Sequence, residues 1–213
     1  MTAIVALIAG STTTAVAAKP PAKPATTLTI AGAVPMITFG NFAKFSGALS
    51  TKETGISVTL QALPFPYTGR YADVATSATT TDGAYSFATL AGMNAKYRTV
   101  AKTKPNATSP EALTSVRWRV GLGVADPTPA RGQHVRFSGT VKPVHANAIV
   151  YVQRLTAAGW KSVKQTTLKS GTATSSSYVV RLTIRHSGTY RTAVLGDGAH
   201  ETGVSRVRKL AVH

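Results

Sequence analysis

The chain contains no cysteine, and this absence excludes several kinds of stabilisation and anchoring. Without a thiol there is no disulfide framework, no thiolate metal site and no lipid-modified cysteine. If the protein is exported, its fold must therefore be held by core burial alone. An extracellular protein without disulfides is more typical of bacteria than of eukaryotes.

Acidic residues are scarce: 7 Asp and Glu stand against 24 Lys and Arg, for a formal net charge of +17. General acid–base chemistry needs positioned carboxylates or histidines. Asp73, Asp82, Asp126 and Glu53 fall in predicted loops or turns, and no serine lies in a nucleophile elbow. No glycine-rich phosphate loop precedes a helix. We therefore expect no enzyme activity and no cofactor.

Long hydrophobic runs are also absent. Residues 4–9 form a short apolar run, whereas a bilayer-spanning helix takes roughly 20 apolar residues. Small residues follow at residues 15–18 and fit a cleavage site, although no basic residue precedes the run. The pattern predicts a signal peptide at residues 1–18 and a Pro-rich spacer at residues 19–24. We expect a secreted, extracellular protein with no transmembrane segment in the mature chain; a disordered tail is the alternative.

The sequence repeats itself once, and this repeat organises the whole chain. Three short motifs recur in the same order about 92 residues later. The matched blocks are residues 44–47 with 136–139, residues 58–61 with 150–153, and residues 97–99 with 190–192. A supersecondary unit copied in this way predicts tandem domains. We place them at residues 25–119 and 120–213, joined without a linker, and expect a stiff, elongated pair.

Each copy shows short runs of alternating apolar and polar residues separated by Gly-rich and Pro-rich turns. About seven strands per copy predict an all-β fold of two tandem antiparallel β-sandwiches. The pattern puts the first strand of each copy at residues 27–30 and 119–122, the last strand at residues 115–119 and 205–210, and a polar loop at residues 102–114.

With the repeat aligned, the second copy resembles the immunoglobulin-like repeats of secreted actinobacterial proteins. The resemblance rests on Gly-x-x-Val-x-Phe-Ser-Gly at residues 132–139, Val-Tyr-Val-Gln-Arg at 150–154, Gly-Trp-Lys at 159–161 and Gly-Thr-Tyr-Arg at 188–191. The first copy also resembles the carboxypeptidase-regulatory-like (prealbumin-like) sandwich domains, through Asp-Gly-Ala-Tyr-Ser-Phe at residues 82–87. Both resemblances imply extracellular accessory or stalk modules without catalysis of their own.

The first copy departs from the immunoglobulin-like pattern at two places. Ala62 stands where the second copy has Arg154, and Gly159-Trp160 has no counterpart. We expect Trp160 in a loop, with a structural role over the edge of the sandwich; binding of a carbohydrate is the alternative. Trp118 alternates with two arginines, so we expect it in a core or between the domains.

One short loop holds three potential metal ligands, Asp197, His200 and Glu201. Carboxylate and imidazole groups so close together could hold a zinc or calcium ion. We expect a solvated loop instead and assign no metal, with the cation site kept as the alternative.

The positive charge is concentrated in the second copy. Residues 121–213 carry 13 basic and 3 acidic residues, whereas residues 25–120 carry 9 and 4. If the strands that carry the arginines share one sheet face, they form a basic stripe for an anionic polymer. The residues of this predicted stripe are Arg136, Arg181, Arg185, Arg191, Arg206 and Arg208. A solvated basic surface that keeps the protein soluble is the alternative.

These observations together predict a non-catalytic adhesion, spacer or binding module at a bacterial cell surface. Its expected partner is an anionic cell-wall polymer or polysaccharide, because an exported protein meets these before it meets nucleic acid. The alternative function is that of an accessory protein for an extracellular enzyme, which binds polysaccharide through loop aromatics such as Trp160.

Overall fold

The structure is a computed structural model that describes residues 25–213; the predicted signal peptide and Pro-rich spacer lie outside this range. The described chain is all-β and contains no helix, so it has none that could cross a membrane. Its strands form four sheets, two in each half of the chain. The predicted fold class of two tandem β-sandwiches is confirmed.

The first sandwich packs the sheet β1-β3-β6 against the sheet β2-β9-β7-β4-β5, in which β8 also pairs with β7. All of its pairs are antiparallel except β2 with β9, which is parallel. Its strands are β1 (Ala31–Gly32), β2 (Met36–Thr38), β3 (Phe42–Ala48), β4 (Ser57–Pro64), β5 (Ala72–Ala78), β6 (Ala84–Leu90), β7 (Ala95–Ala101), β8 (Ala107–Thr108) and β9 (Ala112–Arg117).

The second sandwich packs the sheet β10-β12-β16-β15, with β11 on β12, against the sheet β14-β13-β17-β18, with β19 on β17. Its strands are β10 (Arg119–Val120), β11 (Gly123–Val124), β12 (Gln133–Lys142), β13 (Ile149–Thr156), β14 (Gly159–Thr167), β15 (Lys169–Thr172), β16 (Ser175–Ile184), β17 (Gly188–Val194), β18 (Gly203–Val204) and β19 (Arg208–Leu210). The central pairings repeat those of the first sandwich, with β12-β16 matching β3-β6 and β14-β13-β17 matching β5-β4-β7, whereas β2 and β15 have no counterpart.

The repeated motifs mark equivalent core positions in the two sandwiches. In the first, the rings of Phe45 and Tyr97 lie 4.6 Å apart between β3 and β7, and in the second Phe137 and Tyr190 lie 5.6 Å apart. All four rings are buried. Burial of such alternating apolar side chains supplies the main stabilisation of a domain without disulfides.

The glycine of the repeated Phe-Ser-Gly motif is required by a close approach. A Cβ atom on Gly139 would lie 2.1 Å from the Gly121 carbonyl oxygen and 2.7 Å from the Tyr178 hydroxyl. Tyr178 donates a hydrogen bond of 2.7 Å to that same carbonyl. Gly47 is crowded in the same way by its counterpart Tyr85. The motif therefore recurs because a tyrosine hydroxyl and a crossing chain occupy the space of a side chain.

Several predicted strand positions are wrong in detail. Residues 27–30 form only an isolated bridge at Leu28, and the predicted strand 119–122 contains only β10, with β11 following at Gly123–Val124. The predicted loop 102–114 contains β8 and the start of β9, and only β19 lies in the predicted last strand 205–210. β8, β10, β11 and β19 are two to three residues long and take their pairing from β7, β12 and β17, which local alternation cannot reveal.

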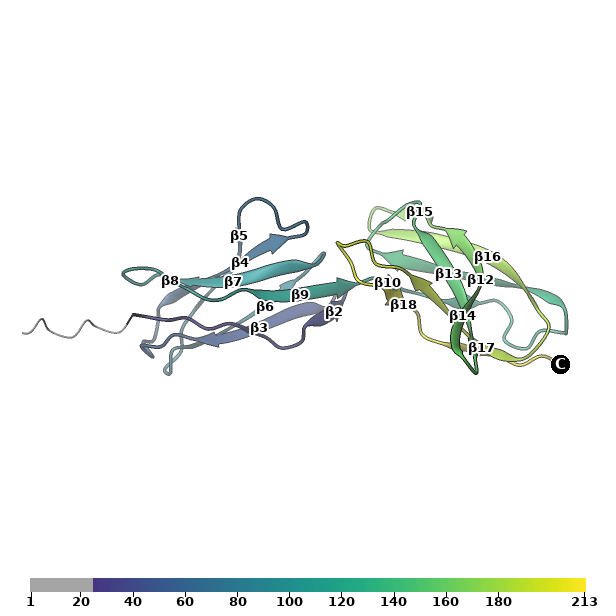
Figure 1. The fold of residues 1–213 in the computed structure, drawn as a ribbon, viewed down its shortest axis with the longest axis horizontal. Coiled ribbons are helices and arrows are strands. Elements are labelled where there is room, and N and C mark those ends of the chain that lie inside the picture. The colour runs from purple at the N-terminus through teal and green to yellow at the C-terminus, as the bar shows by residue number, and fades with distance from the viewer. Residues whose placement is uncertain (1–24) are drawn as a thin grey trace, which may run out of the picture.

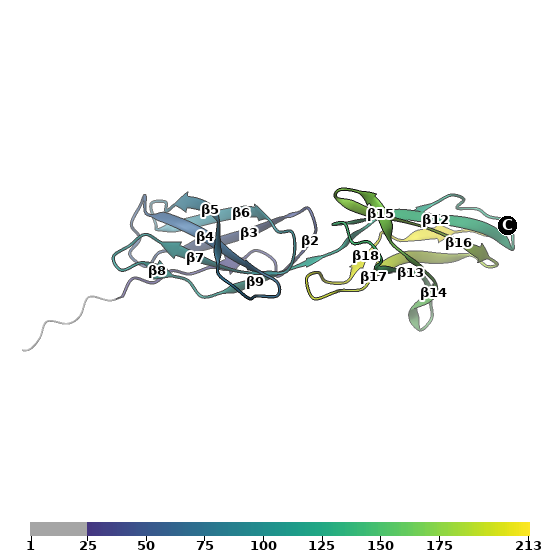
Figure 2. The same cartoon turned by 90° about the horizontal axis from the view of Figure 1, so that it is seen from above.

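The two sandwiches lie end to end along the long axis of the molecule, and the C-terminus is at the outer end of the second one (Figures 1 and 2). The change from one sandwich to the other occurs at Trp118, between the end of β9 and the start of β10. No linker intervenes. The predicted boundary between residues 119 and 120 falls inside β10, which already belongs to the second sandwich.

Candidate functional site

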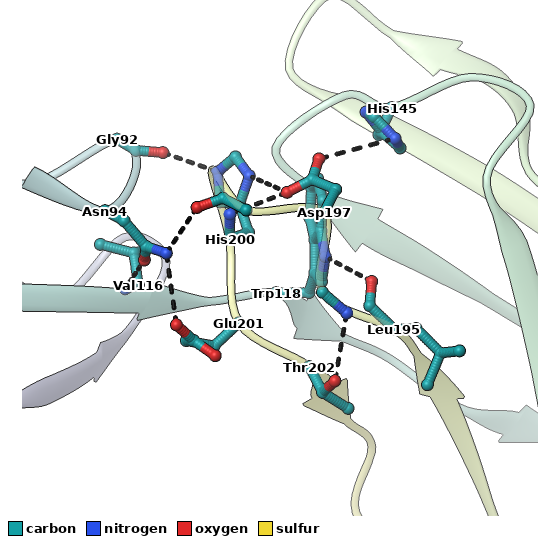
Figure 3. Close-up of polar contacts among 12 residues, drawn as sticks. Gly92, Asn94, Val116, Trp118, His145, Leu195, Asp197, His200, Glu201 and Thr202 are labelled. Carbon is teal, nitrogen blue, oxygen red and sulfur yellow. Dashed lines mark hydrogen bonds and ion pairs between the residues drawn. The ribbon is translucent and has the colours of Figure 1, made fainter. Parts of the chain in front are cut away.

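The junction between the sandwiches is built around Trp118. Its side chain is 1% exposed, and its indole N–H donates to the Leu195 carbonyl at 3.2 Å. The ring stacks on His200 with 4.1 Å between the centroids and meets His145 at 5.0 Å (Figure 3). The expectation that Trp118 lies in a core or between the domains is confirmed. The ring belongs to an apolar cluster of the second sandwich that includes Val141, Val150 and Tyr178, so its burial at the junction also contributes to the core of that sandwich.

Asn94, just before β7, forms four hydrogen bonds at this junction. Its side-chain oxygen accepts from the Val116 N–H at 2.7 Å, and its NH₂ group donates to Gly198 O at 2.9 Å and to the Glu201 carboxylate at 3.3 Å. Its backbone N–H donates to Ala199 O at 2.7 Å. Asn94 is buried. Its bonds to Gly198, Ala199 and Glu201 join the first sandwich to the second, and its bond to Val116 fixes it on β9 (Figure 3).

The segment 195–202 between β17 and β18 reaches from the second sandwich onto the first. Glu201 forms a parallel bridge with Arg117: its N–H donates to Val116 O at 2.8 Å, and its carbonyl accepts from the Trp118 N–H at 3.2 Å. On the other side of the junction, Arg119 donates to Phe39 O at 2.7 Å and to Asn41 Oδ1 at 2.8 Å. The junction is therefore held by main-chain pairing, side-chain hydrogen bonds and a buried ring.

This arrangement corrects the expectation of a solvated loop at residues 197–201 in part, because Asp197 and Gly198 are exposed but His200 is buried. The imidazole of His200 is 7% exposed, and its Nε2 lies 2.8 Å from Gly92 O in the first sandwich. Asp197 accepts from the His200 N–H at 2.8 Å, and Glu201 faces Asn94. Within residues 25–213 no three such side chains converge on a metal position. The side chains of His200 and Glu201 contact the first sandwich, whereas that of Asp197 lies beside His145 and His200 within the second.

The predicted basic stripe is divided between two opposite sheets. Arg136 and Arg181 lie on β12 and β16, and Arg185 directly follows β16. Arg191 and Arg208 belong to β17 and β19 in the other sheet, and Arg206 lies between β18 and β19. The condition that all six share one sheet face is not met, because the strand order of a sandwich separates segments that have the same pattern.

Two of these arginines place their positive charges side by side. Arg136 and Arg181 are direct cross-strand partners on β12 and β16, and both are exposed. Like charges directly opposite each other destabilise a sheet. No Asp or Glu occurs on β10, β12, β15 or β16, and among the described residues neither arginine forms an ion pair. The repulsion on this face is therefore not relieved by the protein itself.

Trp160 lies within β14, opposite Leu155, and not in a loop as predicted. The Arg191 guanidinium stacks over its ring at 4.2 Å and also donates to Gln153 Oε1 at 2.8 Å. Burial lowers the pKa of Arg191 from its ordinary value. Because the guanidinium covers one face of the indole, that face cannot stack on a sugar, which weakens the predicted carbohydrate role.

The first sandwich contains an equivalent of this arrangement, contrary to the prediction that Trp160 has no counterpart. Arg98 stacks over Tyr71 at 4.0 Å and donates to Gln61 Oε1 at 2.9 Å. The aromatic residue could not be aligned because the spacing from the glutamine to the ring differs between the copies. The two arrangements differ in their carboxylates. In the first sandwich Tyr71 also donates to Glu111. In the described part of the second sandwich Arg191 forms no ion pair with a carboxylate.

Comparisons with known proteins give structural likeness only. No protein-family model and no curated protein matches the sequence. A tetra-tandem repeat in the extending region of a large adhesion protein is 16% identical, over 87% of this chain and 49% of that one, with a TM-score of 0.38. Red sea bream transglutaminase is 12% identical, over 88% of this chain and 31% of that one, with a TM-score of 0.45. The chain thus spans half or less of either protein.

Proposed function

We propose that this protein is a non-catalytic extracellular spacer that holds two attachment points at a fixed separation. The observation that supports it best is the junction, in which Trp118, Asn94 and the segment 195–202 fix the second sandwich on the first. Domains joined by short polar contacts swivel by default. A buried indole together with main-chain pairing across the boundary restrains such motion.

The arrangement of the chain fits this role. The two sandwiches lie end to end, with the start of the described chain and the C-terminus at opposite ends (Figures 1 and 2). Two sandwiches placed end to end reach further than the same number of residues packed side by side. The predicted signal peptide and the resemblance to immunoglobulin-like repeats of secreted actinobacterial proteins belong to the same proposal, which places the protein at a cell surface.

Small-angle X-ray scattering of the chain after signal cleavage tests the spacer. We expect the wild-type curve to fit the single extended arrangement of Figure 1. The double variant Trp118→Ala with Asn94→Ala removes the junction contacts and is expected to give a broader distribution of interdomain distances. Arg131→Gln, at the outer end of the second sandwich where its N–H donates to His213 O, is the control. A wild-type curve that requires an ensemble of bent forms contradicts the proposal.

We propose anionic-polymer binding through the β12–β16 face as a second candidate function. The specific observation is the unrelieved Arg136–Arg181 pair, because an anionic partner would remove the repulsion and release counterions. The test is the NaCl concentration that elutes the protein from immobilised anionic wall polymer and from heparin. We expect Arg136→Gln with Arg181→Gln to elute clearly earlier than Lys161→Gln with Lys164→Gln, which removes equal charge from the exposed β14. Equal elution of the two double variants rejects this face.

A further inference from the structure

A groove with a volume of about 410 Å³ opens at the junction of the two sandwiches. It is lined by residues from β2, β9, β10 and β18 and from the segments that follow β2 and β18. Three of the lining residues are arginines, Arg117, Arg119 and Arg206, and no lining residue is acidic. The groove therefore combines a concave shape with a concentrated positive charge.

The protein fixes two of these guanidinium groups without neutralising them. Arg117 donates through Nε to Thr38 Oγ1 at 3.1 Å, and Arg119 donates through Nε and one terminal nitrogen to Phe39 O and Asn41 Oδ1. All of these acceptors are uncharged. Both Nη groups of Arg117 and one of Arg119 have no acceptor in the described protein. The protein therefore holds both guanidinium groups in place and leaves several of their N–H donors without an acceptor.

The carboxylates near this groove contact residues other than its arginines. Glu201, the backbone neighbour of Arg117, turns its carboxylate to Asn94, and Asp197 lies with His145 and His200. Among the described residues none of the three arginines forms an ion pair. Three guanidinium groups that share one groove repel one another, and a bound anion would turn this repulsion into attraction.

We propose that this groove binds a tetrahedral oxyanion, a phosphate or a sulfate ester carried on an anionic polymer. The planar guanidinium presents paired donors that match two oxygens of such a group. Asn41 and Thr38 add neutral donors, because each accepts from an arginine through its oxygen and keeps its own hydrogens. The groove is open along its side, so a chain that carries the oxyanion can continue past it.

The site needs both sandwiches. Thr38, Asn41 and Arg117 come from the first, and Arg119 and Arg206 from the second. Only the docked arrangement brings them together, so a bound oxyanion should also stabilise the junction. The inference goes beyond the spacer role but rests on the same docked junction, which the scattering experiment tests separately. It uses a surface separate from the Arg136–Arg181 pair, so that proposal can fail without this one.

The test is isothermal titration of the full mature chain at low salt with three anionic probes. These are tripolyphosphate, which carries phosphates, a heparin tetrasaccharide, which carries sulfates beside carboxylates, and trigalacturonate, which carries carboxylates alone. We expect tripolyphosphate or the heparin fragment to bind at least about tenfold more tightly than trigalacturonate, with the tighter of the two identifying the source. Charge-assisted bidentate bonds of this kind lose about tenfold in affinity when one guanidinium is removed.

Variants locate the binding. Arg206 makes no side-chain hydrogen bond to the described protein, so Arg206→Gln should leave the fold intact while weakening binding about tenfold. Arg117→Gln should do the same, and Arg131→Gln, with the same change in charge at the outer end, should change affinity less than about twofold. Near-ultraviolet circular dichroism of Trp118 checks that the junction is intact.

Four results would overturn the proposal. The first is no binding of the phosphate and sulfate probes, and the second is equal affinity for the carboxylate probe. The third is a loss in Arg131→Gln equal to that in Arg206→Gln, which would mean non-specific attraction by net charge. The last is a loss confined to Arg136→Gln with Arg181→Gln, which would move the site to the β12–β16 face.

Discussion

The indole of Trp118 stacks on the imidazole of His200 with 4.1 Å between the ring centroids and 29° between their planes. Trp118 ends the first sandwich, and His200 belongs to a loop of the second that contacts the Gly92 carbonyl of the first. One aromatic stack therefore lies where three segments from two domains meet. The stability of the junction and the stiffness of the molecule should depend on the same few side chains.

Replacement of Trp118 by alanine should weaken the junction strongly. Removing a fully buried large aromatic side chain costs about 3–5 kcal/mol, through lost burial and the cavity left behind. We expect denaturant unfolding of the whole chain to move to lower concentration, with the two sandwiches unfolding in separate steps. Trp118→Phe, which keeps a ring against His200, should recover part of the loss. A single unchanged transition in Trp118→Ala would contradict the central role of the indole.

Asn94→Ala should destabilise the same junction by another route. It leaves the buried Val116 N–H without a partner, and an unpaired buried group costs about 1–3 kcal/mol. Hydrogen exchange measured by mass spectrometry should show faster exchange in residues 195–202 and at the start of β10, while β12 and β16 stay protected. Uniformly faster exchange across the second sandwich would mean that Asn94 supports the domain and not the junction.

Gly203→Ala should be poorly tolerated. A Cβ atom there would lie 2.3 Å from the Trp118 carbonyl oxygen and 2.5 Å from the Trp118 Cβ, so the two strands must separate. Overpacking of this kind costs about 1–3 kcal/mol, measured as a lower midpoint of thermal unfolding. The matched control is Gly92→Ala, because a Cβ on Gly92 meets nothing within 4 Å. Equal midpoints for the two variants would contradict the close approach seen at Gly203.

Tyr178 should make the stability depend on pH at the alkaline end. Burial raises the pKa of Tyr178 to about 12, while its hydrogen bond with Thr192 lowers it. Since an unfolded tyrosine ionises near pH 10, the folded state keeps its proton longer. The stabilisation is complete below about pH 10 and is lost as the pH rises to 12, a change of about 2–3 kcal/mol.

The comparison with Tyr178→Phe isolates this effect. The variant should be about 1 kcal/mol less stable at pH 7, because the Gly121 carbonyl loses its donor. Between pH 10 and 12 its free energy of unfolding should fall less steeply than that of the wild type. Parallel curves for the two proteins over this range would show that Tyr178 does not carry the dependence.

The Arg191–Trp160 stack should be visible in fluorescence. Arg191→Ala uncovers one face of the indole, so we expect a red-shifted emission component and stronger quenching by acrylamide. Trp118 is 1% exposed and should remain a protected component in the same spectrum. Arg98→Ala removes the equivalent contact on Tyr71 and serves as the control, because it should leave tryptophan emission unchanged. An unaltered spectrum in Arg191→Ala would contradict the stack.

The sequence predicted the core of each sandwich because local alternation and the repeat report it directly. Phe45 and Phe137 lie where the copied motif places them, and both are buried. Trp118 was predictable as an inward residue because its two neighbours are charged. The short strands β1 and β8 were not predictable, since two-residue segments carry no period of their own.

The proposed functional surfaces could be predicted less well from the sequence. Six arginines with similar strand patterns were expected on one face, but strand order divides them between two sheets. Arg117 and Arg119 were not predicted as binding residues, because nothing in their local sequence indicates that Arg206 lines the same groove. Tyr71 was missed as the partner of Arg98, since the ring comes from a neighbouring strand at a different spacing.

What the sequence determined by itself was an all-β chain of two copied sandwiches, joined without a linker and rich in positive charge. Those properties depend on period, repeat and composition, which are local or additive. Only the tertiary structure decided that the Asp197–Glu201 loop docks on the neighbouring sandwich and that three arginines share a groove. Such contacts depend on which distant segments the strand order brings together, and they form only when the junction closes around Trp118.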